Sequence, residues 1–206
     1  MNGARVLPLM PWENVLFPGM LLPLHVCQAN HLILINYCLD SHGDFGMILT
    51  SDDPSSQQHV GTVAKIIDYQ PSEGGEMTLL VTGTERFTMV ELVDDDPYLK
   101  AMVESFPFIQ ETSRQELEDR AAQVRRLFNH CVKLIASQRG NEVQGVLALP
   151  EQTTDLGWTI ASALSIPPNE RQRLLEKESP GALLQAEILY LESLLIELRE
   201  QNSLES

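Results

Sequence analysis

The chain has 206 residues, of which 43% are apolar, and a formal net charge of −15 at pH 7. The apolar content is enough for a buried core and argues against global disorder. The sequence contains no run of 18 or more apolar residues, so it does not predict a membrane span. The negative charge repels phosphate backbones, so nucleic acid is a poor expected partner. The start of the chain lacks the long apolar stretch of a signal peptide, and we therefore expect a cytoplasmic protein.

Residues 14–26 read NVLFPGMLLPLHV, which predicts two short strands around a turn. Pro18 presets φ for the first corner of the turn, and Gly19 accepts the positive φ of the second. Pro23 lies inside the second apolar run, which favours an edge strand over a central one.

The rest of the first half reads as strands with one inserted helix. Apolar periodicity predicts a helix over 28–41, and two β-branched or apolar runs flanking 71–76 predict a hairpin. Residues 51–59 are polar and contain Pro54, which is typical of a loop. Five or six short strands in about a hundred residues suggest a small closed or nearly closed barrel. The expected strands cover 6–9, 21–26, 45–50, 60–70, 77–92 and 98–106.

The pattern becomes helical after residue 107. Ser113 and Glu116 form a capping box before a long amphipathic helix that stops at Arg139-Gly140. Ser179 and the proline after it start the last helix. Two shorter helices are expected over 154–164 and 170–177. We therefore expect an α+β fold with a β-barrel subdomain over 1–108 and an all-α helical subdomain over 109–206.

Short motifs occur in sequence along most of the chain: LPL at 7–9, VLFPG at 15–19, LPL at 22–24, FG at 45–46, GTVA at 61–64, GTERF at 83–87 and PYL at 97–99. Together with the helical ending, they resemble the N-terminal, substrate-binding domain of Lon proteases (peptidase S16-like). The resemblance implies a PUA-like β-barrel followed by a helical bundle. At 27–31, CQANH replaces a charged segment that is usual in the family. The motif residues expected to have a structural role are Pro18, Gly19, Pro23, Gly83, Arg86 and Phe87.

The resemblance implies that the protein binds unfolded or extended polypeptides. We expect no cofactor and no metal. The chain has no G-x-x-x-x-G-K-[ST] loop for ATP. We therefore expect a stand-alone, non-enzymatic version that lacks the ATPase and peptidase modules of full-length Lon. A role as an adaptor that delivers clients to a separate protease is a natural extension.

Trp12, Phe17 and Met20 are the candidate polypeptide-binding surface. They lie around the opening turn, and methionine suits contacts with varied partners. If they are exposed, they form an apolar patch for an extended segment; if they are buried, they belong to the core. Such a patch, or a strand edge of the barrel, would take the segment by strand addition.

The alternative function is a barrel that binds a small molecule or RNA. A reader of RNA needs a basic face, but residues 1–108 contain 4 basic and 14 acidic side chains. The basic residues are Arg5, Lys65, Arg86 and Lys100. An enzyme of another type is disfavoured, because no convergent set of catalytic residues is visible.

Three further features have both a functional and a structural interpretation. His25, Cys27 and His31 have a spacing that could hold zinc, but no second pair of ligands is nearby, so surface histidines and a core thiol are favoured. Asp94–Asp96 could bind a divalent cation or simply form a turn. Cys38 could be a nucleophile with a histidine nearby in space. Cys38 and Cys131 both lie on apolar helix stripes, however, which indicates buried thiols. A homodimer through the last helix, around Leu194, stays open.

Overall fold

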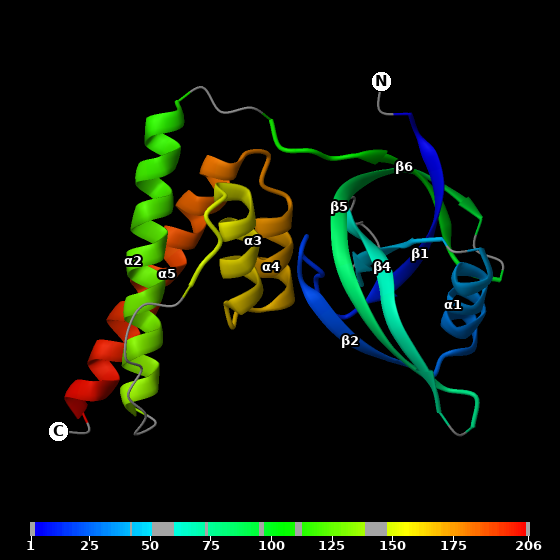
Figure 1. The fold of residues 1–206 in the computed structure, drawn as a ribbon, viewed down its shortest axis with the longest axis horizontal. Helices are drawn as coiled ribbons and strands as arrows, with labels where there is room; N and C mark the ends of the chain where they lie inside the picture. The colour runs from blue at the N-terminus through cyan, green and yellow to red at the C-terminus, as the bar shows by residue number, and fades with distance from the viewer. Residues whose placement is uncertain are drawn as a thin grey trace. The chain divides into compact units, whose positions relative to one another are not determined.

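The computed structural model describes residues 3–41, 43–50, 60–72, 74–94, 97–109, 113–138 and 148–204. Within these ranges the chain forms a mixed α/β fold with one six-stranded sheet and five helices (Figure 1). The loop expected over 51–59, the helix stop at Arg139-Gly140 and most of the Asp94–Asp96 turn lie outside the described residues. The contacts divide the chain into unit 1, Met1–Pro107 with Ser165–Glu176, and unit 2, Phe108–Leu164 with Lys177–Ser206.

The sheet of unit 1 closes on itself through its longest strand, β5. This strand pairs with β4 and β6, while β1 pairs with β3 and β6, so that β5, β4, β3, β1 and β6 form a ring. β2 pairs with the first part of β5 and stands at the end of the strand order. All pairs are antiparallel except β1 with β3. The strands are β1 (Arg5–Trp12), β2 (Leu21–Val26), β3 (Phe45–Leu49), β4 (Val60–Pro71), β5 (Met77–Asp94) and β6 (Lys100–Ser105).

The six expected strands are confirmed with small shifts in their ends, and β2 has the expected bounds. Its terminal place agrees with Pro23, which offers no backbone N–H to a second neighbour. The prediction of a strand directly before the turn is wrong. Val15, Leu16 and Phe17 form a buried non-strand segment, and only a single bridge joins Pro18 to Gly83. The turn bends this segment inward, so its side chains fill the core.

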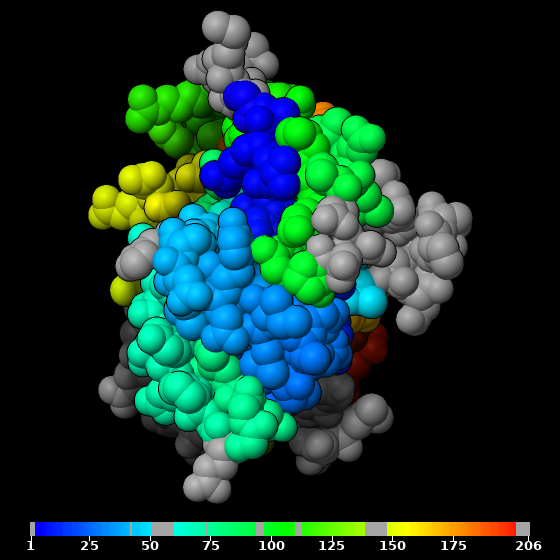
Figure 2. Space-filling model, turned by 90° about the vertical axis from the view of Figure 1, so that its right-hand side faces the viewer, coloured from blue at the N-terminus to red at the C-terminus, as the bar shows by residue number. Residues whose placement is uncertain are grey.

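Helix α1 (Ala29–Ser41) confirms the inserted helix and covers one side of unit 1. Its buried residues, His31, Leu34, Ile35 and Cys38, face a core cluster that includes Met10 and Phe45. A second cluster, built around Leu9 and Phe87, lies on the other face of β1. The space-filling view in Figure 2 shows α1 at the surface of this unit, beside atoms of the β4–β5 hairpin.

Unit 2 contains three helices that pack on one another: α2 (Arg114–Gln138), α3 (Thr153–Ala163) and α5 (Pro180–Leu204). Ser113 and Ser179 accept hydrogen bonds from the backbone N–H groups of Glu116 and Ala182, at 3.3 and 3.2 Å, as expected for helix caps. The apolar stripe of α5 is buried, including Leu184, Ile188, Leu191, Leu195 and Leu198.

Helix α4 (Pro168–Leu175) forms close to the expected position, but it packs with a different part of the chain from the one expected. We expected it within the helical subdomain over 109–206, whereas the contacts group Ser165–Glu176 with unit 1. The reason is a pair of hydrogen bonds from Arg171 and Gln172 to backbone carbonyls of the first hundred residues. No helix in the described part of the chain is long and apolar enough to span a membrane.

Candidate functional site

The opening turn docks onto strand β5 at Gly83. Gly19 has φ +76°, and the Met20 N–H donates to the Phe17 carbonyl at 3.1 Å, which closes the turn. Gly19 N–H donates to the Gly83 carbonyl at 2.8 Å, and Gly83 N–H donates to the Met20 carbonyl at 3.0 Å. A Cβ at Gly83 would overlap the Phe17 carbonyl oxygen. Only glycine therefore lets the turn approach the strand this closely.

Phe87 is buried against two other motif glycines. A Cβ at Gly46 would lie 2.7 Å from the Phe87 ring, and a Cβ at Gly61 would lie 2.5 Å from it. The ring thus occupies the space that side chains on β3 and β4 would need. The GTERF, FG and GTVA motifs meet at this one packing contact.

Phe17 is fully buried, so it cannot form part of an exposed apolar patch. The guanidinium of Arg171 lies over its ring, with Cζ 4.8 Å from the centroid. The same guanidinium donates to the Val15 carbonyl at 3.4 Å and approaches the Met20 sulfur at 3.6 Å. Burial lowers the pKa of Arg171. The turn is apolar because it carries core side chains, and α4 lies over them.

Trp12 and Met20 are half-buried and pack against the core cluster. The Trp12 ring lies 6.4 Å from the His31 ring. The strongly exposed apolar side chain next to the turn is instead Leu21, which is 60% exposed at the start of β2. Of the predicted surface, Trp12 and Met20 thus keep partial access and Phe17 has none.

Arg86 joins strand β5 to the end of α4. Its guanidinium donates to the Leu175 carbonyl at 2.6 Å and lies over the Phe106 ring, with Cζ 4.6 Å from the centroid. Burial lowers the pKa of Arg86 to about 10, so the group stays protonated at neutral pH. A cation here ties together three segments that are distant in sequence, and this role is structural.

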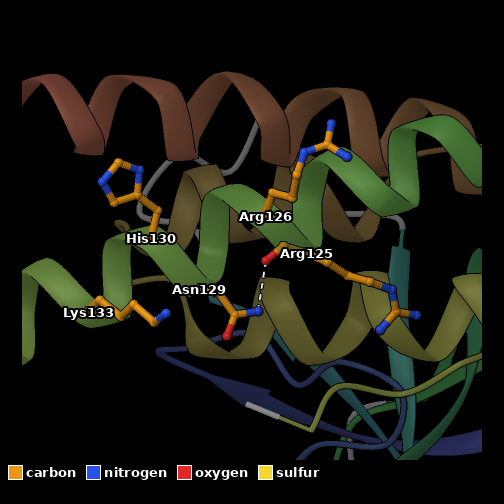
Figure 3. Close-up of a pocket in the computed structure, with 5 residues that line it drawn as sticks. All are labelled: Arg125, Arg126, Asn129, His130 and Lys133. Carbon is orange, nitrogen blue, oxygen red and sulfur yellow. Dashed lines mark hydrogen bonds between the residues drawn. The ribbon is translucent and has the colours of Figure 1, made fainter. Parts of the chain in front are cut away.

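Unit 2 contains a basic cavity on α2, with a volume of about 410 Å³ (Figure 3). Its lining side chains extend from about two and a half turns of one helix. They are Arg125, Arg126, Asn129, His130 and Lys133.

The family profile of the ATP-dependent protease La (LON) substrate-binding domain matches residues 6–193. The chain belongs to this family. The Lon protease of Anaeromyxobacter dehalogenans (strain 2CP-C) is 29% identical over 180 residues, which cover 83% of this chain and 21% of that protein. The Lon protease of Paraburkholderia phytofirmans is 32% identical over 177 residues, which cover 82% of this chain and 22% of that protein. The chain thus spans about a fifth of the length of these relatives.

Two solved structures of Lon N-terminal domains have the same fold. The Lon N-terminal domain protein from Xanthomonas campestris matches with a TM-score of 0.65 and 24% identity, over 88% of this chain and 95% of that chain. The N-terminal domain of Lon protease from the Mycobacterium avium complex matches with a TM-score of 0.71 and 16% identity, over 91% and 98%.

The histidines and cysteines of this Lon-family chain do not meet in a metal site within the described residues. His25 is an exposed histidine as expected and pairs with Glu76 at 3.0 Å. The expected core thiol at Cys27 and surface histidine at His31 are wrong. Cys27 precedes helix α1 and is exposed, whereas His31 lies on the buried face of α1, where desolvation lowers its pKa. Cys38 is a buried thiol as expected, and burial raises its pKa to about 11. The thiol is a poor nucleophile in that state.

Sequence reasoning missed Leu21, Arg171 and the basic face of α2. Leu21 had a weak signal, because it is the first residue of a strand already expected to be an edge. Arg171 had none, since its partners lie about 150 residues away in sequence. The α2 face could have been found from the sequence, because no carboxylate occurs between 121 and 138.

Proposed function

We propose that unit 1 binds unfolded or extended polypeptide segments by strand addition at β2. The observation that carries this proposal is the terminal position of β2, combined with the 60% exposure of Leu21 at its start. An added segment would hydrogen-bond to the outer backbone groups of β2, and Leu21 would supply apolar contact. Pro23 removes one donor from that edge, so pairing would be short and affinity modest.

Family membership supports polypeptides as the ligand class. The closed ring of strands and the packed helices α2, α3 and α5 support the finer description of a PUA-like barrel with a helical bundle. We infer a binding role without catalysis, since the matched region is confined to the substrate-binding domain. An adaptor role toward a separate protease extends this proposal. RNA is less favoured, because Arg86, one of four basic residues in 1–108, is buried in a structural role.

A capture experiment with one client protein in denatured and native forms tests the proposal. Immobilised protein should retain the denatured client and release the native one. Equal recovery of both forms, or recovery of neither, would count against polypeptide binding.

A matched pair of variants locates the site. Leu21→Lys places a charge beside the β2 edge and should reduce capture of the denatured client. Ile33→Lys makes a similar change at a 46% exposed position on α1, which has no strand edge, and should leave capture unchanged. Equal effects of the two variants would point away from β2.

A further inference from the structure

The second half of α2 is basic in a strongly acidic chain. Between residues 121 and 138 the sequence has three cations, one histidine and no carboxylate, although the whole chain has a net charge of −15. The cations are Arg125, Arg126 and Lys133. This local reversal of charge is the feature from which the inference starts.

Three of the cavity-lining residues, Arg126, His130 and Lys133, lie on the face of α2 that points away from its buried stripe. The buried residues Ala121, Val124 and Cys131 form that stripe, and the Cys131 thiol lies 3.7 Å from the Leu191 carbonyl oxygen on α5. The helical repeat of 3.6 residues sets positions 126, 130 and 133 roughly opposite. Their side chains therefore reach solvent around the cavity instead of the helix packing.

Two of the five lining residues have structural hydrogen bonds. Arg125 donates to the backbone carbonyls of Leu149, Pro150 and Glu151, and so holds the segment before α3. Asn129 donates to the Arg125 carbonyl at 2.8 Å, drawn as the dashed line in Figure 3.

The other three lining residues are available to a ligand. Arg126, His130 and Lys133 are exposed, and the structure gives them no hydrogen bond or ion pair with other described residues. Their apolar stems line the cavity while their polar ends reach water. At about 410 Å³ the cavity lies within the range of about 300–1,000 Å³ that is typical of ligand pockets.

We propose that this α2 basic face, defined by Arg126, His130 and Lys133, binds acidic segments of polypeptide clients. The proposal rests on the proposed polypeptide-binding function and names a client class for it. Glutamate and aspartate carboxylates are the complementary partners of the two cations, Arg126 and Lys133. Double-stranded DNA carries about one negative charge per 1.7 Å along its whole length, so beyond this face it would be repelled by the acidic rest of the protein. A short acidic segment fits a cluster of this size.

Fluorescence anisotropy with labelled, unstructured peptides tests the proposal. A Glu-rich peptide should bind the wild type more tightly than a peptide of the same length with Gln in place of Glu. The variant Arg126→Gln/Lys133→Gln should weaken Glu-rich peptide binding about fivefold. Arg5→Gln/Lys65→Gln changes the net charge equally but lies on unit 1, and it should leave that binding unchanged. Added salt should weaken the wild-type interaction.

Three results would overturn the inference. Equal loss in both double variants would make the effect one of net charge, and no loss in either would place the acidic segment elsewhere. Tighter, patch-dependent binding of a single-stranded DNA oligomer would assign the face to nucleic acid. Capture of denatured client in parallel separates the two proposals: patch-dependent binding of the Glu-rich peptide without client capture supports the basic face and contradicts strand addition at β2.

Discussion

At the scale of single residues, the motif glycines mark places where another group occupies the space of a side chain. Gly83 faces the Phe17 carbonyl, and Gly46 and Gly61 face the Phe87 ring. In unit 2, Gly157 on α3 similarly lies against Leu183 on α5. These contacts explain why glycine occurs within strands and a helix, where it is otherwise unfavourable.

Replacing Gly83 with alanine should destabilise the protein by about 3 kcal/mol, because the new methyl group must displace a backbone carbonyl. Urea unfolding measures the change. Gly3→Ala is the matched control, since nothing lies within 4 Å of a Cβ there, and it should be close to neutral. A stable Gly83→Ala variant would show that the turn does not need this close approach.

Glu187 is a buried acid in the helix packing of unit 2. Its side chain is fully buried on α5, near the Ala161 backbone, and its two oxygens make no hydrogen bond of normal geometry with a described residue. Burial raises the pKa of Glu187 well above its usual range. The carboxyl is therefore neutral in the folded state under conditions in which it ionises in the unfolded chain.

This difference predicts how stability depends on pH. Because the pKa of Glu187 is raised in the folded state, its contribution to the free energy of unfolding is fully present below its unfolded-state pKa. That contribution is lost as the pH rises toward its folded-state pKa. Glu187→Gln should therefore gain stability relative to wild type by up to about 1.4 kcal/mol per pH unit in that window. Urea unfolding between pH 5 and 7.5 measures it, with exposed Glu197→Gln as control. Parallel pH profiles for wild type and Glu187→Gln would contradict the assignment.

At the scale of elements, α4 shows how a local pattern can predict a helix but not its partner. Its proline start and its length follow from nearby residues. Its position depends on Arg171 and Gln172, which reach the Val15 and Val60 carbonyls. Arg86 adds a third link, to the Leu175 carbonyl.

Removing one of these hydrogen bonds should weaken the packing of α4 against the rest of unit 1. Arg171→Met loses its hydrogen bond to the Val15 carbonyl and its contact with the Phe17 ring, and should lower the free energy of unfolding by about 1–3 kcal/mol. Hydrogen exchange should become faster in α4. Arg173→Met affects an exposed pair with Glu170 on the same helix and should change stability by less than about 0.5 kcal/mol. Similar effects of the two variants would mean that the buried guanidinium does not hold the helix.

The sequence was most informative where the signal was local. Pro18-Gly19, the alternating runs and the serine caps predicted the turn, the six strands and the helix starts, because the physical constraint lies within a few residues. Burial of Phe17 could not be predicted, since it depends on Arg171 from the far end of the chain. Exposure of Leu21 likewise depends on which strand ends the sheet, and that is a property of the topology.

At the scale of the whole molecule, the two units carry different candidate surfaces. Unit 1 offers the β2 edge, and unit 2 offers the α2 basic face. Eight of the 14 basic residues lie in unit 2, which has a net charge of −5, while unit 1 has a net charge of −10. We propose acidic segments as ligands of unit 2 and backbone pairing with extended segments as the role of unit 1.

The most direct test of the account is hydrogen exchange of the full chain with and without a denatured client. Strand addition predicts slower exchange of the β2 amides, Leu21–Val26 apart from Pro23, when the client is bound. The amides of α1 should be unaffected. Client binding that protects other segments and leaves β2 unchanged would contradict the central claim.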